Sequence, residues 1–363
     1  MKIVSLGGGT GLSTLLKGLK TFYPADPATD LLEMVLEKAA GVEPLRVTDL
    51  SAVVAVSDDG GSSGRLRREF QVLPPGDIRN CMVALSEDET LLSRLFQFRF
   101  ASGQGLKGHS FGNLFLTALT GITGDFQEAI QVSSEVLAIR GHIYPSTMSN
   151  VRLEAELDNG RIARGETQVS RSRRPIRRLR LSPRNCRPVP KAIEAIAQAD
   201  IITLGPGSLF TSLIPNLLVK GVAEAIAESR AARVFICNLM TQPGETSQFS
   251  AADHLRAVTA HAGGQRLFDY VMVNSGAISP SALRRYQASG ARAVGASQAE
   301  LEQQGVRVVS GNFVSEKRTG PASGRWVRHD SVQVAKAVLE TGAGHHYWRD
   351  EQIAAAEIAA AAK

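Results

Sequence analysis

The chain has 363 residues, 43% of them hydrophobic and 21% charged, which is typical of a globular protein and excludes disorder along most of its length. Its net charge of +6 is local: residues 161–187 hold ten arginines and one acid, a net +9, so the rest of the chain carries −3. A nucleic-acid surface spread over the chain is therefore excluded, and no apolar run approaches the roughly 18 residues of a membrane span.

The start of the chain predicts a cytoplasmic protein. Residues 1–6 run into glycines without the apolar region of a signal peptide. The cysteines, Cys81, Cys186 and Cys237, match neither a disulfide framework nor a zinc spacing, which fits a reducing compartment. We expect no membrane span.

The first unit is an apolar strand at residues 2–6, a glycine turn at 7–11 and a helix. Four leucines fall on one face of that helix: Leu12, Leu15, Leu16 and Leu19. A second strand is expected at 50–57, and residues 23–48, with a helix at 31–40, are expected to be a surface insertion. Strands alternating with amphipathic helices predict a Rossmann-like, doubly wound, mostly parallel α/β sheet.

Alternation from Val151 to Leu157 and the turn Asp158-Asn159-Gly160 indicate a β-hairpin. We therefore expect a small, basic, β-rich insertion at 144–188 in one α/β core made of 1–143 and 189–345. Further strands are expected at 201–204, 234–237 and 270–274, and the alanine-rich 346–363 is expected to form a peripheral helix.

Two glycine turns follow predicted strands. Gly8, Gly9, Thr10 and Gly11 lack bulky side chains, and the next helix would direct its free N–H groups at the same place, which suits an anion. The spacing is neither that of a Rossmann fingerprint nor a Walker motif, and a tight turn without a ligand is the alternative. The second turn, with Gly205, Gly207 and Ser208, repeats the device, and Ser208 would donate to an anion or cap a helix. Together they predict a two-point grip on a diphosphate, or on a phosphate and a sugar.

Asp58 and Asp59 directly follow an apolar strand. Carboxylates there would bind ribose hydroxyls, hold Mg²⁺ beside phosphates or act as a base; turn formation and capping are the alternative. Asp77 is expected to be the N-cap of a helix. An equal alternative is that this segment faces a ligand through Arg79 and Asn80.

Three further side chains are candidates, each with a structural alternative. His109 precedes an apolar helix and is either structural or functional. Asn238 follows a strand and would read a base or sugar edge, and Arg328 would pair with a phosphate unless it is simply a solvated surface residue. The arginines of 161–187 are interpreted as a solvated strand face, because no aromatic residues interleave with them. Binding to nucleic acid is not expected.

Several motifs occurring in one order resemble the YvcK-like branch of the CofD superfamily, whose members are called gluconeogenesis factors. The resemblance covers about residues 1–340, and the motifs that carry it are residues 7–13, 58–67, 74–81, 108–113, 205–212 and 238–246. The segment 23–48 and the arginines after Arg171 look unusual for the family.

The resemblance implies a Rossmann-like core that binds UDP-N-acetylglucosamine or a related UDP-sugar, in the regulation of cell envelope synthesis, cell shape and carbon metabolism. It implies ligand-binding roles for Gly8, Gly9, Thr10, Gly11, Asp58, Asp59, Gly205, Gly207, Ser208, Asn238 and Arg328. The resemblance implies a protein that needs no cofactor and that acts on a regulatory protein partner. Whether the chain forms a homodimer is left open.

No catalytic residue is established, and the candidates are Asp58, Asp59 and His109. The alternative function is that of the related CofD enzymes, which transfer a phospholactyl-type group to a deazaflavin with Mg²⁺. In that case Asp58 or Asp59 would hold the metal, and His109 would assist proton transfer.

Overall fold

In a computed structural model, the described residues are 1–24, 45–87, 91–318 and 325–345. The predicted helices at 31–40 and 346–363 lie outside these ranges, as does most of the expected insertion at 23–48. Within the described residues, no single helix is long and apolar enough to cross a membrane; one pair, Leu209–Leu217 with Val222–Glu228, meets the length and composition criteria only together and is bent by 73°.

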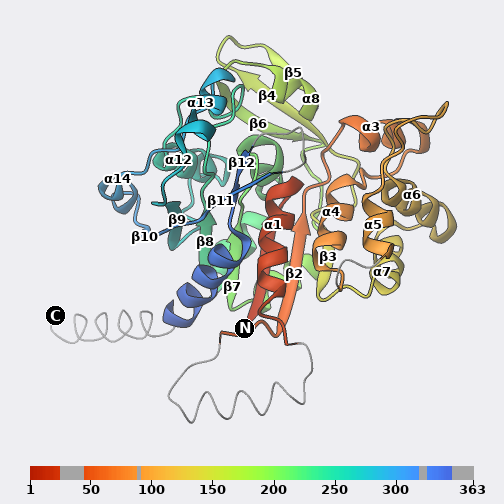
Figure 1. The fold of residues 1–363 in the computed structure, drawn as a ribbon, viewed down its shortest axis with the longest axis horizontal. Helices are drawn as coiled ribbons and strands as arrows, with labels where there is room; N and C mark the ends of the chain where they lie inside the picture. Colours follow the sequence, from red (N-terminus) through yellow and green to blue (C-terminus); the bar gives the residue numbers. More distant parts are fainter. Residues whose placement is uncertain (25–44, 88–90, 319–324, 346–363) are drawn as a thin grey trace.

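A seven-stranded parallel sheet forms the centre of the molecule, in the order β10-β9-β8-β7-β1-β2-β3 (Figure 1). Its strands are β1 (Lys2–Gly7), β2 (Asp49–Val54), β3 (His142–Pro145), β7 (Ile201–Leu204), β8 (Ala232–Ile236), β9 (Tyr270–Asn274) and β10 (Arg307–Gly311). The central strands are almost wholly buried, which explains their continuous apolar sequences. The predicted α/β fold is confirmed.

Two strands differ from their predicted bounds by more than one residue at one end. The second strand ends at Val54, not at residue 57, because Gly7, the last residue of β1, pairs with Val54 and leaves nothing beyond it to pair with. Residues 55–57 nevertheless stay buried, so their apolar sequence extended the prediction. Strand β8 begins at Ala232, two residues before the expected start, and ends at Ile236.

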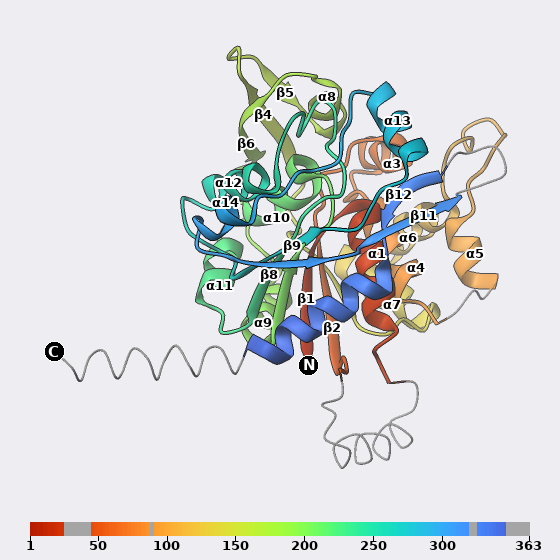
Figure 2. The ribbon, with the colours of Figure 1, turned by 60° about the vertical axis from the view of Figure 1, so that its left-hand side comes forward.

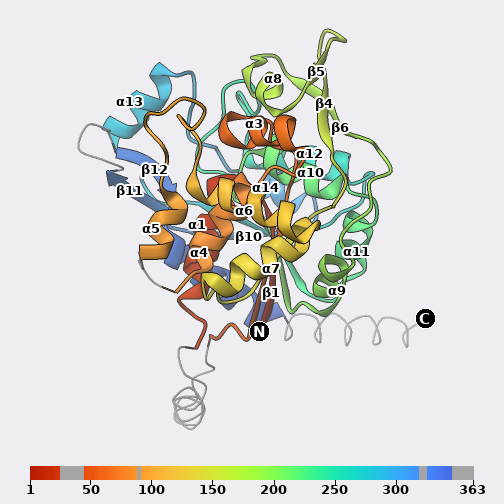
Figure 3. The same ribbon diagram turned by 90° about the vertical axis from the view of Figure 1, so that its right-hand side faces the viewer.

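Helices cover both faces of the sheet (Figures 1 and 3). The first half supplies α1 (Gly9–Lys20), α3 (Gly61–Phe70), α4 (Gly76–Leu85), α5 (Leu91–Gln97), α6 (Phe111–Thr123) and α7 (Phe126–Val136). The second half supplies α9 (Pro190–Gln198), the π-helical turn η1 (Leu209–Leu213), α10 (Ile214–Leu217), α11 (Val222–Glu228), α12 (Ala251–His261), α13 (Pro280–Ala288) and α14 (Gln298–Glu302).

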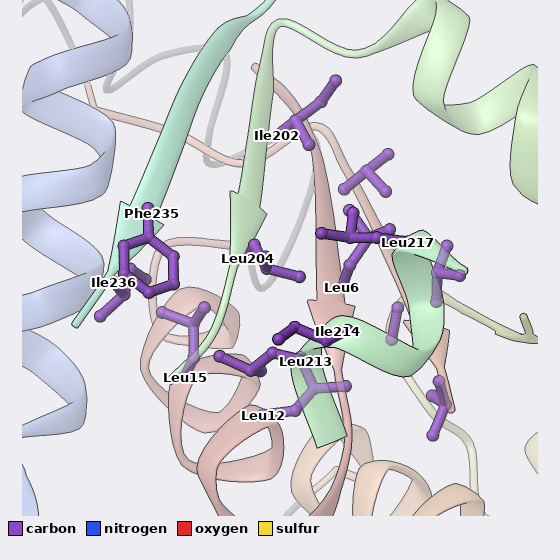
Figure 4. Packing of buried hydrophobic residues seen from close by; sticks show 14 of the residues in the cluster. Leu6, Leu12, Leu15, Ile202, Leu204, Leu213, Ile214, Leu217, Phe235 and Ile236 are labelled. Atoms are coloured by element: carbon purple, nitrogen blue, oxygen red, sulfur yellow. The ribbon is translucent and has the colours of Figure 1, made fainter. Parts of the chain in front are cut away.

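The C-terminal helix of residues 331–345 packs along α1, where Ser331 and Ala335 approach Gly18 (Figure 2). Between the sheet and its helices lies one core, in which Leu6, Leu12 and Leu15 meet side chains from β7, β8, η1 and α10 (Figure 4). This core joins the first and middle thirds of the chain, and so it holds the carboxyl ends of β1 and β7 side by side.

A separate three-stranded antiparallel sheet, in the order β5-β4-β6, projects beyond the carboxyl ends of the main strands (Figure 1). Its strands are β4 (Arg152–Leu157), β5 (Ile162–Arg164) and β6 (Ile176–Ser182), and the short helix α8 (Glu166–Arg171) connects β5 to β6. The preceding β3 still belongs to the main sheet and ends at Pro145, so its last two residues fall inside the expected insertion. A two-stranded ribbon, β11 (Val314–Arg318) with β12 (Arg325–His329), completes the fold.

Arginines of the small sheet face solvent and partly pair with acids of the same sheet. Three ion pairs join arginines to β4 or its turn: Arg164–Glu154, Arg180–Glu156 and Arg174–Asp158. Leu179 and Leu181 of β6 are buried on the opposite face. This arrangement supports the interpretation of the basic stretch as a solvated strand face.

Candidate functional site

The chain changes direction across the sheet between β1 and β7. From β1 it runs outward to β2 and β3, then returns to β7 and runs the other way through β8 to β10. The carboxyl ends of adjacent strands at such a switch point leave a crevice in which open α/β sheets bind ligands. Both glycine turns lie there, one after β1 and one after β7.

The two turns touch each other. A Cβ added at Gly11 would lie 2.2 Å from the carbonyl oxygen of Pro206, so only glycine permits this approach. Gly9 has a φ of +62°, a left-handed conformation that glycine adopts without strain. Helix α1 begins at Gly9, and its free N–H groups therefore lie at the contact between the turns.

A cavity of about 230 Å³ opens over both turns. Its lining includes eight of the predicted ligand-binding residues: Gly8, Gly9, Thr10, Gly11, Gly207, Ser208, Asn238 and Arg328. The remaining predicted residues, Gly205, Asp58 and Asp59, are not among those that line it. Gly205 instead packs under the turn, where a Cβ would lie 2.7 Å from the carbonyl oxygen of Ile236.

Asn238 holds the second turn in place. Its amide nitrogen donates to the Gly207 carbonyl at 2.7 Å, and its amide oxygen accepts the Gly207 N–H at 3.1 Å. Gln242 donates in the same way to the Ser208 hydroxyl at 2.8 Å, so Ser208 makes no side-chain cap. These two bonds hold the second turn, and Asn238 also lines the cavity, so its contact with a base or sugar edge stays a prediction.

The opposite wall comes from β12. Arg328 lines the cavity and has no acidic or hydrogen-bonding partner within the described residues. Its neighbour His329, in contrast, has a hydrogen-bonding partner, because its Nε2 lies 3.2 Å from the Cys237 carbonyl oxygen. Burial lowers the pKa of His329 to about 4. At neutral pH His329 is therefore uncharged, and Arg328 supplies the positive charge of this wall.

Asp77 is the second residue of α4, and Pro75 occupies the N-cap position, so the expected N-cap role of Asp77 is wrong. The carboxylate points at the first glycine turn and accepts the N–H of Gly9. Burial, together with the nearby charge of Asp58, raises the pKa of Asp77 to about 6. Asp77 thus braces the turn from behind, while Arg79 and Asn80 of the same helix line a different cavity.

Asp58 and Asp59 bond to different partners. Asp58 accepts the N–H of Gly60 at 2.8 Å, while Asp59 accepts the N–H and the hydroxyl of Thr167 in α8 at 2.9 and 2.7 Å. Within the described part of the chain, no group of three or more His, Cys, Asp or Glu side chains is arranged to hold a metal ion. The pair serves as a turn former and as an anchor of the small sheet, and we derive no step through Mg²⁺ from it.

His109 is buried at the start of α6 and is not among the cavity's lining residues. Its Nδ1 lies 3.0 Å from the buried hydroxyl of Ser62 in α3, and burial lowers its pKa. The pair links α3 to α6, which favours the structural alternative for this histidine.

Ten residues line the cavity that the sequence analysis did not nominate: Thr14, Pro206, Ser212, Leu239, Met240, Thr241, Gln242, Tyr286, Val327 and His329. Most lie in or beside segments that carried the family resemblance, which was the available signal. Tyr286 had none, since it comes from α13 and reaches the cavity by packing against β12, where its hydroxyl donates to the Val327 carbonyl at 3.3 Å.

Fold and site together define a doubly wound α/β protein with an anion-binding geometry at its switch point. Residues 3–314 match the family model described as 2-phospho-L-lactate transferase CofD. The chain therefore belongs to the CofD family, in its YvcK-like branch.

Relatives of that branch match nearly the whole chain. A "Putative gluconeogenesis factor" of Nostoc sp. is 48% identical over 95% of this chain and 70% of its own length. The "Gluconeogenesis factor" of Bacillus subtilis is 42% identical over 93% of this chain and 97% of its own length. A crystal structure of protein BH3568 from Bacillus halodurans is 43% identical, covers 93% of this chain and 99% of that chain, and superposes with a TM-score of 0.83.

Proposed function

We propose that the protein binds a nucleotide sugar of the UDP-N-acetylglucosamine type and acts as a cytoplasmic regulator of cell envelope synthesis, cell shape and gluconeogenic growth. The supporting observation is that two turns about 200 residues apart in sequence line one cavity at the switch point, together with Arg328, for which the described part of the chain supplies no partner. The diphosphate rests on the N–H groups of Thr10 and Gly11 and on that of Ser208 in the second turn, and Arg328 neutralises its charge.

Regulation without turnover fits the placement of the candidate catalytic groups. Asp58, Asp59 and His109 are hydrogen-bonded to protein groups and do not line the cavity. A ligand on the glycine turns would thus be held by backbone amides, amides of side chains and one arginine. Its presence would be signalled to a protein partner.

The second candidate is the Mg²⁺-dependent transfer of a phospholactyl-type group to a deazaflavin, which the description of the matching family model favours. This reaction would need the metal near Asp58. It makes binding and product formation depend on Mg²⁺ and on that carboxylate.

Thermal unfolding with UDP-N-acetylglucosamine, UDP, GDP or NAD, each with and without Mg²⁺, separates the two. A ligand at about 100 times its dissociation constant adds about 2.7 kcal/mol to the free energy of unfolding. We expect stabilisation by the UDP-sugar without metal. Arg328→Gln should weaken binding about tenfold, because a hydrogen bond to a charged group is lost, and Arg68→Gln, an exposed arginine of α3, serves as the control.

Asp58→Asn provides the contrasting variant. It should change the affinity for the UDP-sugar little, because Asp58 is not among the residues lining the cavity. Stabilisation by GDP only with Mg²⁺, abolished by Asp58→Asn and accompanied by product with a deazaflavin acceptor, would contradict the regulatory function and establish the transferase.

A further inference from the structure

A second cavity is also lined by residues of α1 and plays no part in the proposed function. It occupies about 690 Å³ between α1, α4 and α5, which lie side by side in Figure 1. This volume is within the range of small-molecule sites. Thr14 lines both this groove and the cavity over the glycine turns, so the two sites adjoin.

The described lining of the groove carries four cationic side chains. Lys17 and Lys20 come from α1, Arg79 from α4 and Arg94 from α5, and the described lining residues include no Asp or Glu. Lys17 and Lys20 lie three residues apart, on one face of the helix. Four positive charges therefore converge on one concave surface from three helices, which concentrates the field.

Two of these cations are available to a ligand. The side chains of Lys17 and Arg94 are exposed and have no acidic or hydrogen-bonding partner within the described residues. Each presents several N–H donors and, at neutral pH, a full charge. Lys20 donates to the carbonyl of Ser86, another lining residue, at 2.6 Å, and this bond holds its ammonium group at the groove.

Arg79 adds a cation that protein groups only partly satisfy. Its Nη2 donates to the Asn80 side chain at 2.7 Å, while its buried Nε has no hydrogen-bond partner. Burial is the main cause that lowers the pKa of Arg79, and the nearby charge of Arg99 lowers it further. An anion in the groove would offset both effects.

We propose that this groove is a binding site for a small polyanion that carries at least two phosphate groups. A single phosphate would reach only part of a cationic lining that extends over three helices, whereas two phosphates match a pair of cations on each side. A nucleic acid or a lipid surface fits less well, because the site is a concave pocket between helices and not an open face. The polyanion and the nucleotide sugar would occupy neighbouring sites separated by Thr14.

Isothermal titration of the full chain with pyrophosphate, orthophosphate and sulfate at constant ionic strength tests this site. We expect pyrophosphate to bind most tightly, and the double variant Lys17→Gln/Arg94→Gln to weaken its binding about tenfold or more. The double variant Arg68→Gln/Arg284→Gln removes the same charge from exposed positions outside the groove and should change the affinity less than about threefold.

Pyrophosphate also resembles the diphosphate of a nucleotide, so Arg328→Gln is the control for the other cavity. Retained binding in Arg328→Gln with loss in the groove variant supports the inference, whether or not a UDP-sugar binds the glycine turns. Loss in Arg328→Gln with retention in the groove variant would assign the anion to the glycine turns and overturn it. Absence of pyrophosphate binding by the unaltered protein at millimolar concentration would overturn it as well.

Discussion

Glu166 stands at the start of α8 among four other carboxylates. Burial is the largest cause that raises its pKa, to about 9, and the charges of Asp58, Asp77, Glu245 and Asp59 raise it further. The side chain is therefore protonated in the folded protein at neutral pH. In the unfolded chain the same carboxyl group ionises at its ordinary value of 4.5.

The sign of the pH dependence follows from this difference. Between pH 4.5 and about 9 the folded state retains a proton that the unfolded state has released, so Glu166 makes the free energy of unfolding fall as pH rises. The slope for one proton is at most about 1.4 kcal/mol per pH unit. We expect Glu166→Gln to remove this contribution and to be more stable than the unaltered protein at pH 8, with little difference at pH 5.

Urea denaturation at a series of pH values measures this effect. Glu224→Gln, an exposed carboxylate in α11, is the matched control and should follow the pH profile of the unaltered protein. Parallel profiles for Glu166→Gln and the unaltered protein would show that Glu166 is ionised in the fold.

At the scale of elements, α1 packs against the turn after β7 too closely to accept a side chain at Gly11. A Cβ at Gly11 would lie 2.2 Å from the Pro206 oxygen and 2.9 Å from the Gly207 Cα, both of them backbone atoms. We expect Gly11→Ala to lower the free energy of unfolding by about 2 kcal/mol or more, because the helix and the turn must separate. Chemical denaturation gives the value.

Gly121→Ala is the control for this substitution. Gly121 lies in α6 with nothing within 4 Å of a Cβ, so alanine there should stabilise the protein by about 0.5–1 kcal/mol through helix propensity. Equal effects at the two glycines would contradict the close packing of α1 on the second turn.

The sequence predicted the elements of this region better than it predicted its side-chain contacts. The strand-turn-helix pattern in the sequence located β1, β7 and both glycine turns. A strand buried on both faces is apolar throughout, and a tight turn needs glycine, so both features are visible in a short stretch of sequence. Asp77 was assigned to capping, whereas it braces the first turn, and the bonds by which Asn238 holds the second turn were not predicted. Such roles depend on which elements meet across the sheet, and that information is not local. The cationic groove was missed for the same reason, since its charges come from three helices.

At the scale of the whole molecule, the small sheet is joined to the core by partly buried polar contacts as well as by its two chain connections. Asp59 accepts two hydrogen bonds from Thr167, and Glu245 accepts the Ser170 hydroxyl at 3.1 Å. The Leu179 N–H donates to His261 Nε2 at 2.9 Å, which covers part of the free edge of β6. These contacts link the small sheet to the segments that shape the ligand cavity, because Glu245 also accepts the N–H of Phe210.

This linkage predicts that the small sheet and the main sheet unfold as one unit. We expect the amides of β6 and β1 to exchange hydrogen at the rate of global unfolding in the unaltered protein. Thr167→Val removes one hydrogen bond to Asp59 and should speed exchange in β6 while leaving β1 unchanged. Thr120→Val, whose hydroxyl bonds only within α6, should leave β6 protected. Mass spectrometry of the exchanged peptides distinguishes these outcomes, and rapid exchange of β6 already in the unaltered protein would show that the small sheet opens independently of the cavity.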